Sequence, residues 1–358
     1  MSLHFHSLFI KQVRKETQDC VSVLFDIPEE LKNVFEYKAG QYLTLRKIID
    51  GKEVRRNYSL CSSPIQNEWR IAIKKVDGGI FSSFANEKLK AGDSIDVMPP
   101  MGKFLTSINT TQQKKYVAFA AGSGITPVLS IIYTILKTEP TGNVVLVYGN
   151  KNRSSIIFKE ALDALKNNYI DRFQLIHILS REKTDAAIHH GRINDEKLIE
   201  LTKLIELKSI DEFFVCGPEQ MILTTKSFLI DQKINPQKIH VELFASANRQ
   251  PSIVNRESQV IDNSPKSKIT VKLDGISFDF DLAFNSSSIL DAALQQGADL
   301  PYACKGGVCC TCKAKLVEGS VSMDVNYSLE SEEIEAGYIL TCQSHPTTEK
   351  VVVDYDIK

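Results

Sequence analysis

Four cysteines near the C-terminus constrain the fold of this chain more than any other feature of its sequence. Cys304, Cys309 and Cys312 are spaced C-x4-C-x2-C, and Cys342 follows after twenty-nine further residues. This is the plant-type spacing for a two-iron, two-sulfur cluster held by four thiolates. Three ligands must therefore share one loop, and the chain must return after a separate element to supply the fourth.

Two other kinds of site use cysteines. Soft thiolate ligands also suit zinc, but structural zinc sites usually take their cysteines as two pairs that are close in sequence. A disulfide framework is disfavoured because nothing else in the chain indicates secretion. Gly306 and Gly307 lack Cβ atoms, so the loop backbone can approach a cluster and point N–H groups at its sulfurs. Cys310 would require x5 and x1 spacings as a ligand, and we interpret it as a non-ligand neighbour.

The charge of the chain is distributed unevenly. The 358 residues, 43% of them hydrophobic, can form two or three domains, and their net charge is −1. Residues 268–358 carry fourteen acidic and seven basic side chains, whereas the other 267 residues carry thirty acidic and thirty-six basic. An acidic module on a basic body favours electrostatic docking between redox partners, with an ordinary charged surface as the alternative.

Neither a membrane nor a nucleic acid is an expected partner. No apolar run is long enough to span a bilayer, and the N-terminal residues resemble neither a signal peptide nor a transit peptide. Four of the eight cysteines lie outside the cluster pattern, which suits a reducing compartment. We therefore expect a cytoplasmic protein.

Changes in sequence pattern predict three domains and a linker. Residues 1–108 contain short alternating strands separated by Gly and Pro, typical of a small antiparallel β-barrel. Residues 109–245 alternate apolar strands with helices, which predicts a doubly wound α/β domain with a parallel sheet. Residues 246–267 are polar and aperiodic and form the predicted linker. Residues 268–358 begin with a hairpin and a helix, continue into the cysteine loop, and end with a strand.

The first domain carries a candidate cofactor site at the end of a strand. Arg56 and Tyr58 point to the same face of an extended segment, where they could contact a pyrophosphate and a flat ring. An ordinary surface strand is the alternative. Gly78 and Gly79 precede an expected helix from Ser82 to Lys88, whose first backbone N–H groups could bind an anion.

The second domain has three candidate segments at the carboxyl ends of strands. The segment from Gly122 to Pro127 predicts a phosphate-binding turn, with Pro127 at the first helical position. Cys216 and Gly217 follow a strand end, where ligands bind in such sheets; a small buried hydrophobic residue is the alternative for Cys216. Ser180 and Arg181 follow another strand and could bind a ribose 2′-phosphate, with a solvated turn as the alternative.

Together these motifs give almost the whole chain a resemblance to known families. Residues 1–245 resemble the ferredoxin–NADP reductase superfamily, and residues 266–358 resemble a plant-type ferredoxin, an α+β module with a β-grasp-like fold. The domain order is similar to that of the reductase components of bacterial phenylacetyl-CoA epoxidase and related multicomponent oxygenases. The resemblance implies FAD, NADPH and a 2Fe-2S cluster as cofactors and a separate oxygenase component as the partner.

The resemblance also implies roles for individual residues. Ser59 would lie near the reactive flavin nitrogen, Cys216 would face the nicotinamide ring, and Glu242 and Phe244 would lie beside the flavin. The remaining FAD-binding residues would be Arg56, Tyr58, Gly79, Phe81 and Ser82. The remaining nucleotide-binding residues would be Gly122, Ser123, Gly124, Thr126, Ser180, Arg181 and Gly217.

The expected function is electron supply to an oxygenase. A hydride would pass from NADPH to FAD, and single electrons would then pass to the cluster and to the oxygenase, with Ser59, Cys216 and Glu242 as catalytic residues. One alternative is a reductase for another oxygenase, a hydroxylase or a desaturase. Others are a redox sensor or electron-transfer adaptor without steady turnover, and a flavin reductase that acts directly on small acceptors or ferric complexes.

Overall fold

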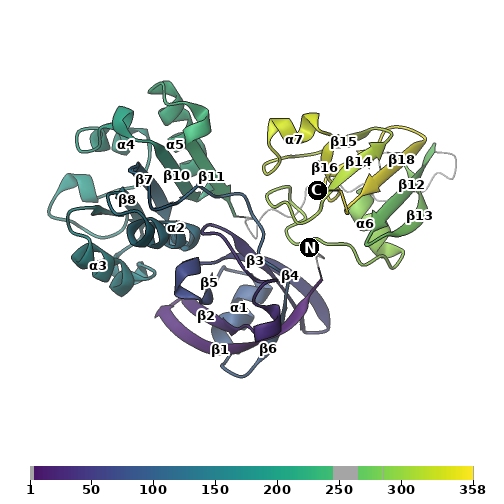
Figure 1. The fold of residues 1–358 in the computed structure, drawn as a ribbon, viewed down its shortest axis with the longest axis horizontal. Coiled ribbons are helices and arrows are strands. Elements are labelled where there is room, and N and C mark those ends of the chain that lie inside the picture. Colours follow the sequence, from purple (N-terminus) through teal and green to yellow (C-terminus); the bar gives the residue numbers. More distant parts are fainter. Residues whose placement is uncertain (1–3, 245–264, 285, 358) are drawn as a thin grey trace. The chain divides into compact units, whose positions relative to one another are not determined.

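The computed structural model describes residues 4–244, 265–284 and 286–357. The chain divides into two compact units, Phe5–Phe244 and a C-terminal unit of Ala245–Lys358 together with Met1–His4 (Figure 1). The first unit contains a six-stranded and a five-stranded sheet, and the second contains a five-stranded and a two-stranded sheet. No helix in the described residues is long and apolar enough to cross a membrane.

The six-stranded sheet forms the predicted antiparallel barrel. Its order is β4-β3-β6-β1-β2-β5, and a bridge between Leu60 and Ile71 closes the sheet by joining the chain after β4 to β5. Helix α1 (Ile80–Glu87) packs against β4 and β5; it begins two residues before the predicted Ser82 because Gly79, in an extended conformation, precedes the first helical turn. The strands are β1 (His6–Thr17), β2 (Cys20–Asp26), β3 (Tyr42–Ile49), β4 (Lys52–Ser59), β5 (Trp69–Lys74) and β6 (Ser94–Val97).

The five-stranded sheet of the first unit is parallel, with the order β11-β10-β7-β8-β9. The strand order reverses between β7 and β10, and ligands bind at the carboxyl ends of strands at such a switch point. The strands are β7 (Lys115–Ala121), β8 (Asn143–Asn150), β9 (Phe173–Leu179), β10 (Glu212–Gly217) and β11 (Ile239–Leu243). The helices are α2 (Ile125–Thr138), α3 (Lys159–Asn168), α4 (Asp195–Leu201) and α5 (Glu219–Asp231).

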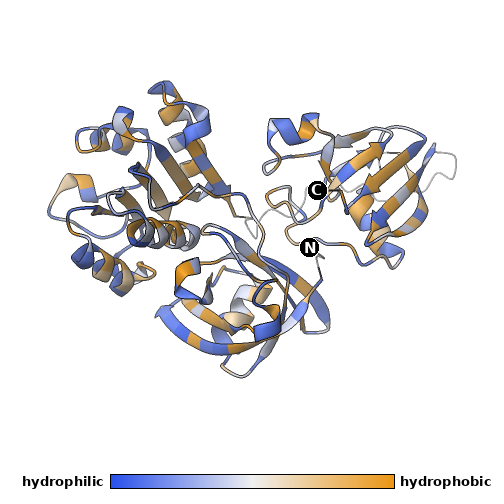
Figure 2. Ribbon diagram, in the orientation of Figure 1, coloured by the Kyte–Doolittle hydropathy of each residue, from blue (hydrophilic) through white to orange (hydrophobic). Residues whose placement is uncertain are grey.

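Strand β7 explains why this sheet is covered on both faces. Tyr116 and Ala118 belong to the hydrophobic cluster that contains α2 and α3, whereas Val117 and Phe119 belong to the cluster that contains α4 and α5. Alternating side chains point to opposite faces of a strand, so a continuous apolar run requires helices on both sides. In Figure 2 the central strands are accordingly among the most hydrophobic segments.

The start of α2 differs from the sequence prediction. A 3₁₀ turn spans Gly122–Gly124 and α2 begins at Ile125, so the prediction that Pro127 occupies the first helical position is wrong. Pro127 is the third residue of the helix. The proline is tolerated there because the first N–H groups of a helix have no intrahelical acceptor.

The C-terminal unit contains a mixed sheet with the order β13-β12-β18-β14-β16, in which β12 and β18 are parallel. Helix α6 (Ile289–Gln295) is capped by the side chain of Ser288, and α7 (Ser331–Glu335) lies before β16. Strand β12 begins at Lys266, before the predicted end of the linker, and residues 246–264 lie outside the described residues. The strands are β12 (Lys266–Leu273), β13 (Ile276–Ala283), β14 (Lys313–Glu318), β15 (Val321–Met323), β16 (Tyr338–Leu340), β17 (Ser344–Pro346) and β18 (Lys350–Asp354).

Candidate functional site

Three predicted catalytic residues come together where the two sheets of the first unit meet. Parallel pairing of β10 with β11 aligns Cys216 with Glu242. Ser59, the last residue of β4, donates a hydrogen bond from its Oγ to Oε2 of Glu242 at 3.2 Å. Ser59 and Cys216 are buried. A barrel strand and two strands of the parallel sheet therefore build one small polar site.

Burial keeps this site uncharged at neutral pH. Desolvation raises the pKa of Glu242 to about 8, although the hydrogen bond from Ser59 opposes the shift. Burial, together with the neighbouring carboxyl group of Glu242, raises the pKa of Cys216 well above its usual range. Below about pH 8 the site therefore holds a protonated acid, a neutral thiol and a hydroxyl group, and each can carry a proton beside a bound ring.

The predicted flavin-binding residues lie next to this site on β4 and at the start of α1. The rings of Tyr58 and Phe81 are 5.6 Å apart, which connects β4 to the helix. A Cβ at Gly79 would come within 2.4 Å of the Ser82 Oγ and 3.1 Å of the Val76 carbonyl oxygen, so a larger residue would displace the Ser82 side chain. The Ser82 Oγ also accepts a hydrogen bond from the backbone N–H of Val76 at 3.1 Å. The turn thus presents the first N–H groups of α1 to an anion.

Arg56 supplies positive charge near the end of the same strand. Its side chain is exposed, and its Nη1 donates to the carbonyl of Arg55 at 2.7 Å. Phe244, the last residue described in the first unit, is also exposed. The cation, the aromatic ring of Tyr58 and the glycine turn suit an aromatic cofactor that carries a pyrophosphate.

The predicted nucleotide-binding turn touches the end of β10. A Cβ at Gly124 would come within 2.2 Å of the Cys216 carbonyl oxygen, and Gly122 has a positive φ of 54°. Thr126 donates its Oγ1 to the carbonyl of Ser123 at 3.0 Å and so stabilises the turn. These contacts bring together the carboxyl ends of β7 and β10, the two strands at the switch point.

Two residues at this turn were missed by the sequence analysis. Tyr148 donates its hydroxyl to the carbonyl of Gly122 at 3.0 Å. The Nζ of Lys74 lies 3.8 Å from the position that a Cβ on Gly122 would occupy. Both residues lie at or near strand ends. The sequence gives little indication of these contacts, because the contact partner is far away along the chain.

Ser180 and Arg181 lie at the same edge of the sheet, beyond β9. Their backbone N–H groups donate to the carbonyls of Asn150 and Lys151 at 2.9 and 2.8 Å and extend the pairing of β8 with β9. The neighbouring Glu182 pairs with Arg153 at 2.8 Å, and the side chain of Arg181 is exposed. Strand β9 is two strands from β7, about 10 Å, so Arg181 and the predicted phosphate-binding turn at Gly122 lie at the same edge of the sheet.

The four cysteines form two pairs. The Sγ atoms of Cys304 and Cys309 are 3.1 Å apart, and Cys312 and Cys342 are hydrogen bonded to each other. The hydrogen bond from Cys309 lowers the pKa of Cys304 below its usual range. Cys310 instead donates its Sγ to the carbonyl of Ser328 at 3.2 Å.

This arrangement fits two irons better than a single zinc ion. A tetrahedral zinc site needs its four sulfurs about 2.3 Å from one ion. Two thiolate pairs match a cluster in which each of two irons takes two cysteines.

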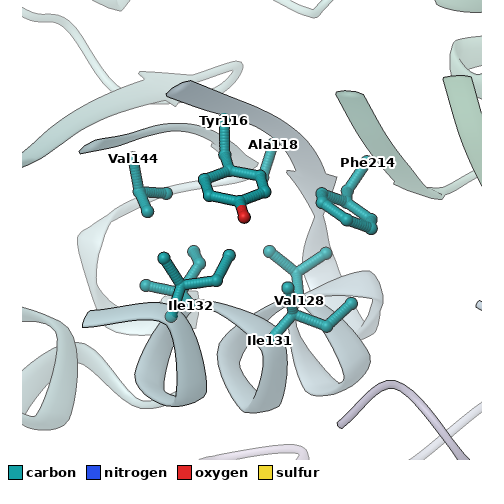
Figure 3. Close-up of a pocket in the computed structure, with 8 residues that line it drawn as sticks. Tyr116, Ala118, Val128, Ile131, Ile132, Val144 and Phe214 are labelled. Carbon is teal, nitrogen blue, oxygen red and sulfur yellow. The ribbon is translucent and has the colours of Figure 1, made fainter. Parts of the chain in front are cut away.

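An apolar pocket between α2 and the parallel sheet contains no cofactor-binding candidate. Figure 3 shows Tyr116, Ala118, Val144 and Phe214 of the parallel sheet facing apolar side chains of α2. Its lining contains none of the predicted site residues, and it lies within the core beneath α2. The residues predicted to bind cofactors lie instead at the strand ends and turns described above.

Comparisons with protein families assign each of the three domains. Residues 7–105 match an oxidoreductase FAD-binding domain, residues 119–227 match an oxidoreductase NAD-binding domain, and residues 271–347 match a 2Fe-2S iron-sulfur cluster binding domain. The matched ranges follow the order of the three predicted domains.

Several proteins are similar over the full length. The chain is 45% identical to a subunit of the 1,2-phenylacetyl-CoA epoxidase of Escherichia coli K12, covering 99% of this chain and 98% of that protein. It is 32% identical to the ferredoxin reductase component of 3-ketosteroid-9-alpha-monooxygenase of Rhodococcus rhodochrous, covering 97% and 96%. The crystal structure of phthalate dioxygenase reductase matches with a TM-score of 0.59 and 22% identity over 98% of each chain, which shows a shared fold.

The cysteine pairing predicts which thiol is dispensable. Cys309→Ser removes one member of a ligand pair, so the iron content should fall from about two per chain to near zero. Cys310→Ser is the matched control and should keep both the iron and the visible spectrum, because Cys310 bonds to Ser328. Iron analysis and absorption spectroscopy measure both variants, and loss of iron from Cys310→Ser alone would contradict the assignment.

The raised pKa of Glu242 predicts a pH-dependent stability. The folded pKa of about 8 exceeds the ordinary value of 4.5, so the stabilising effect of the protonated form is present below about pH 4.5 and is lost as the pH rises toward 8. Glu242→Gln removes this titration. The Tm of the variant relative to wild type should therefore increase between pH 6 and 8.5, whereas exposed Glu36→Gln should keep a constant difference. A constant difference for Glu242→Gln would show that this carboxyl group titrates normally.

Proposed function

This chain belongs to the family of oxygenase reductases that join an FAD-binding, an NAD-binding and a 2Fe-2S ferredoxin domain, and we propose that its partner is a phenylacetyl-CoA epoxidase-type oxygenase. It is an NAD(P)H-dependent flavin oxidoreductase that transfers electrons through FAD and the cluster to an oxygenase. The observation that carries the choice of partner is the full-length identity to the epoxidase protein of Escherichia coli, which is higher than that to the ketosteroid reductase.

The bound groups supply the electron chemistry, and the chain positions them. FAD converts a two-electron hydride into single electrons, and the cluster carries one electron at a time. In our proposal, Arg56 and the first turn of α1 bind the pyrophosphate of FAD, and Tyr58 contacts its ring system. Phe81, buried under that turn, supports Tyr58. Phe244, exposed after the last strand of the parallel sheet, would lie beside the ring system.

The three predicted catalytic residues, Ser59, Cys216 and Glu242, would hold protons near the bound rings and orient these rings. The hydroxyl of Ser59 donates to the carboxyl group of Glu242, and this contact would keep its oxygen in one position beside the ring. The neutral thiol of Cys216 fills the end of β10, where it would set the distance between the nicotinamide and the flavin. The protonated carboxyl group of Glu242 would supply a proton in a site that water does not readily enter.

The nicotinamide nucleotide would extend along the carboxyl edge of the parallel sheet. Backbone N–H groups of the Gly122–Gly124 turn bind its pyrophosphate in this proposal, and the Nζ of Lys74 adds a positive charge nearby. Gly217 would lie beside the nicotinamide end; a Cβ there would come within 2.7 Å of the Met221 Cε and 3.2 Å of Ala121, so a larger residue would disturb the end of β10. Ser180 and Arg181 would bind the 2′-phosphate of NADPH.

The oxygenase would dock on the acidic side of the C-terminal unit. Glu332 and Glu335 are exposed on α7. Glu330 and Glu333 have structural contacts, since the Glu333 side chain accepts from the Glu330 N–H at 3.0 Å and pairs with Lys313 at 3.2 Å. Exposed Tyr327 lies between α7 and the cysteine loop, where its N–H donates to the carbonyl of Gly307 at 3.0 Å. Exposed aromatic and acidic side chains in this part of the chain would suit a basic partner surface.

We also propose a cytoplasmic location. None of the eight cysteines, all of which lie in the described part of the chain, forms a disulfide, and thiols of this kind persist in a reducing compartment.

Reconstitution with the oxygenase tests the proposed partner. The chain, NADPH and the oxygenase component of phenylacetyl-CoA epoxidase should form epoxide from phenylacetyl-CoA. The oxygenase component of the ketosteroid monooxygenase, supplied with its own substrate, should give at least tenfold less product, which is a difference of about 1.4 kcal/mol in activation free energy. Equal rates, or no epoxide, would instead favour a reductase for another oxygenase, a hydroxylase or a desaturase.

The same assay tests the docking surface through two matched double variants. Glu332→Gln with Glu335→Gln should slow electron delivery at low salt and weaken its salt dependence, because exposed charges steer association. Asp279→Asn with Asp281→Asn removes two exposed charges from strand β13 and should behave like wild type. Flavin reduction by NADPH should be unaffected in both. If the two double variants behave alike, the acidic face of α7 has no part in docking.

The nucleotide preference follows from Arg181. A guanidinium–phosphate contact contributes about 2 kcal/mol, roughly thirtyfold in affinity. Arg181→Ala should therefore lower kcat/KM for NADPH by about that factor and leave the value for NADH almost unchanged. Lys183→Ala, an exposed cation in the same loop, is the control and should change neither value much. Equal losses with both nucleotides in Arg181→Ala would remove Arg181 from the phosphate site.

A further inference from the structure

Cys342 reaches the other ligands from a distant part of the chain, and both of its neighbours hold it in place. Strand β16 pairs with β14 so that Leu340 lies opposite Lys313, which brings the next turn beside Cys312. Thr341 donates its backbone N–H and its Oγ1 to the carbonyl of Cys312, at 3.2 and 3.0 Å. Pairing that begins in the sheet therefore fixes the residue before Cys342 to the third ligand.

Gln343 fixes the other side of Cys342 through its side chain. This side chain is only 6% exposed. Its Nε2 has two N–H groups: one donates to the carbonyl oxygen of Lys305 at 3.0 Å, and the other is shared between the carbonyl oxygen of Cys342 at 2.9 Å and the Sγ of Cys342 at 3.5 Å. One amide group therefore contacts both the loop that follows the first ligand and the sulfur of the fourth.

The loop that Gln343 contacts has a conformation that needs support. Lys305 is not a glycine, yet it has a φ of +51°, a left-handed conformation that L-residues rarely adopt. Gly307 has a φ of +70°, and a Cβ there would come within 2.9 Å of the Val325 carbonyl oxygen and 3.4 Å of the Gln343 Cγ. The loop is thus packed directly against Gln343, and the carbonyl of its strained residue accepts the amide hydrogen bond.

The same amide acts electrostatically on the fourth ligand. N–H groups that point at ligand sulfurs stabilise the more negative, reduced state of a cluster and so raise its reduction potential. The backbone N–H of Gly306 makes such a contact with Cys304 at 3.4 Å. At Cys342 a donor comes from a side chain, which a substitution can remove without changing the backbone.

We propose that Gln343 is a positioning residue that joins the fourth ligand to the ligand loop and raises the reduction potential of the cluster site. It thereby favours electron uptake from the flavin side of the chain. The inference rests on the proposed electron-transfer function and adds to it a residue that sets how readily the cluster site accepts an electron.

A redox titration of the full chain tests this role. Gln343→Met keeps an unbranched side chain of similar length but has no N–H donor. Its cluster should have a midpoint potential about 59 mV lower than wild type, which corresponds to a tenfold weaker uptake of one electron. Gln343→Glu keeps the shape, removes the donor and adds a negative charge, so its potential should be lower still. Gln295→Met, at an exposed position on α6, is the matched control.

Electron paramagnetic resonance detects only those chains that contain a reduced cluster. The midpoint potential measured in this way therefore does not depend on how many chains in the sample contain iron. The midpoint potential at which the signal appears should be lower in both Gln343 variants than in the Gln295→Met control. Midpoint potentials equal to that of the control would overturn the role of Gln343. Wild-type protein without an iron–sulfur signal would instead overturn the proposed function itself.

Discussion

The close approach of the Gly122–Gly124 turn to the end of β10 determines the site of the reductase unit. A side chain at Gly124 has no space, because its Cβ would lie 2.2 Å from the Cys216 carbonyl oxygen. The contact exists because β7 and β10 are neighbours at the point where the strand order reverses. With Cys216 fixed, parallel pairing aligns Glu242 with it, and Ser59 reaches Glu242 from the barrel. One steric requirement thus links two sheets and the three predicted catalytic side chains.

The two units place different kinds of polar group at their sites. In the reductase unit, the groups at the site can hold protons, and burial keeps the carboxyl group of Glu242 protonated up to about pH 8. In the ferredoxin unit, amide N–H groups of Gly306 and Gln343 point at the cysteine sulfurs. Amides do not titrate, so they can stabilise added negative charge without taking up a proton. This division suits a chain that receives a hydride at one site and releases single electrons at another.

Much of this architecture could be predicted because it depends on local patterns. The spacing of Cys304, Cys309, Cys312 and Cys342 indicates the cluster from thiolate chemistry alone, and strand periodicity indicates both sheets of the first unit. Helix starts were less predictable: Ile80 and Ile125 begin helices after a glycine N-cap and a 3₁₀ turn, which leave little trace in side-chain pattern. Tyr148 and Gln343 were missed because their partners, Gly122 and Lys305, are 26 and 38 residues away.

The central claim is that electrons leave the chain only through the four-cysteine site. Cys304→Ser tests it most directly, because it removes a ligand while the reductase unit, a separate compact unit, stays intact. Rapid mixing with NADPH should reduce the flavin of this variant at the wild-type rate, and delivery of single electrons to the oxygenase should be lost. Delivery at the wild-type rate would show that the flavin passes electrons directly to the partner and would contradict the account.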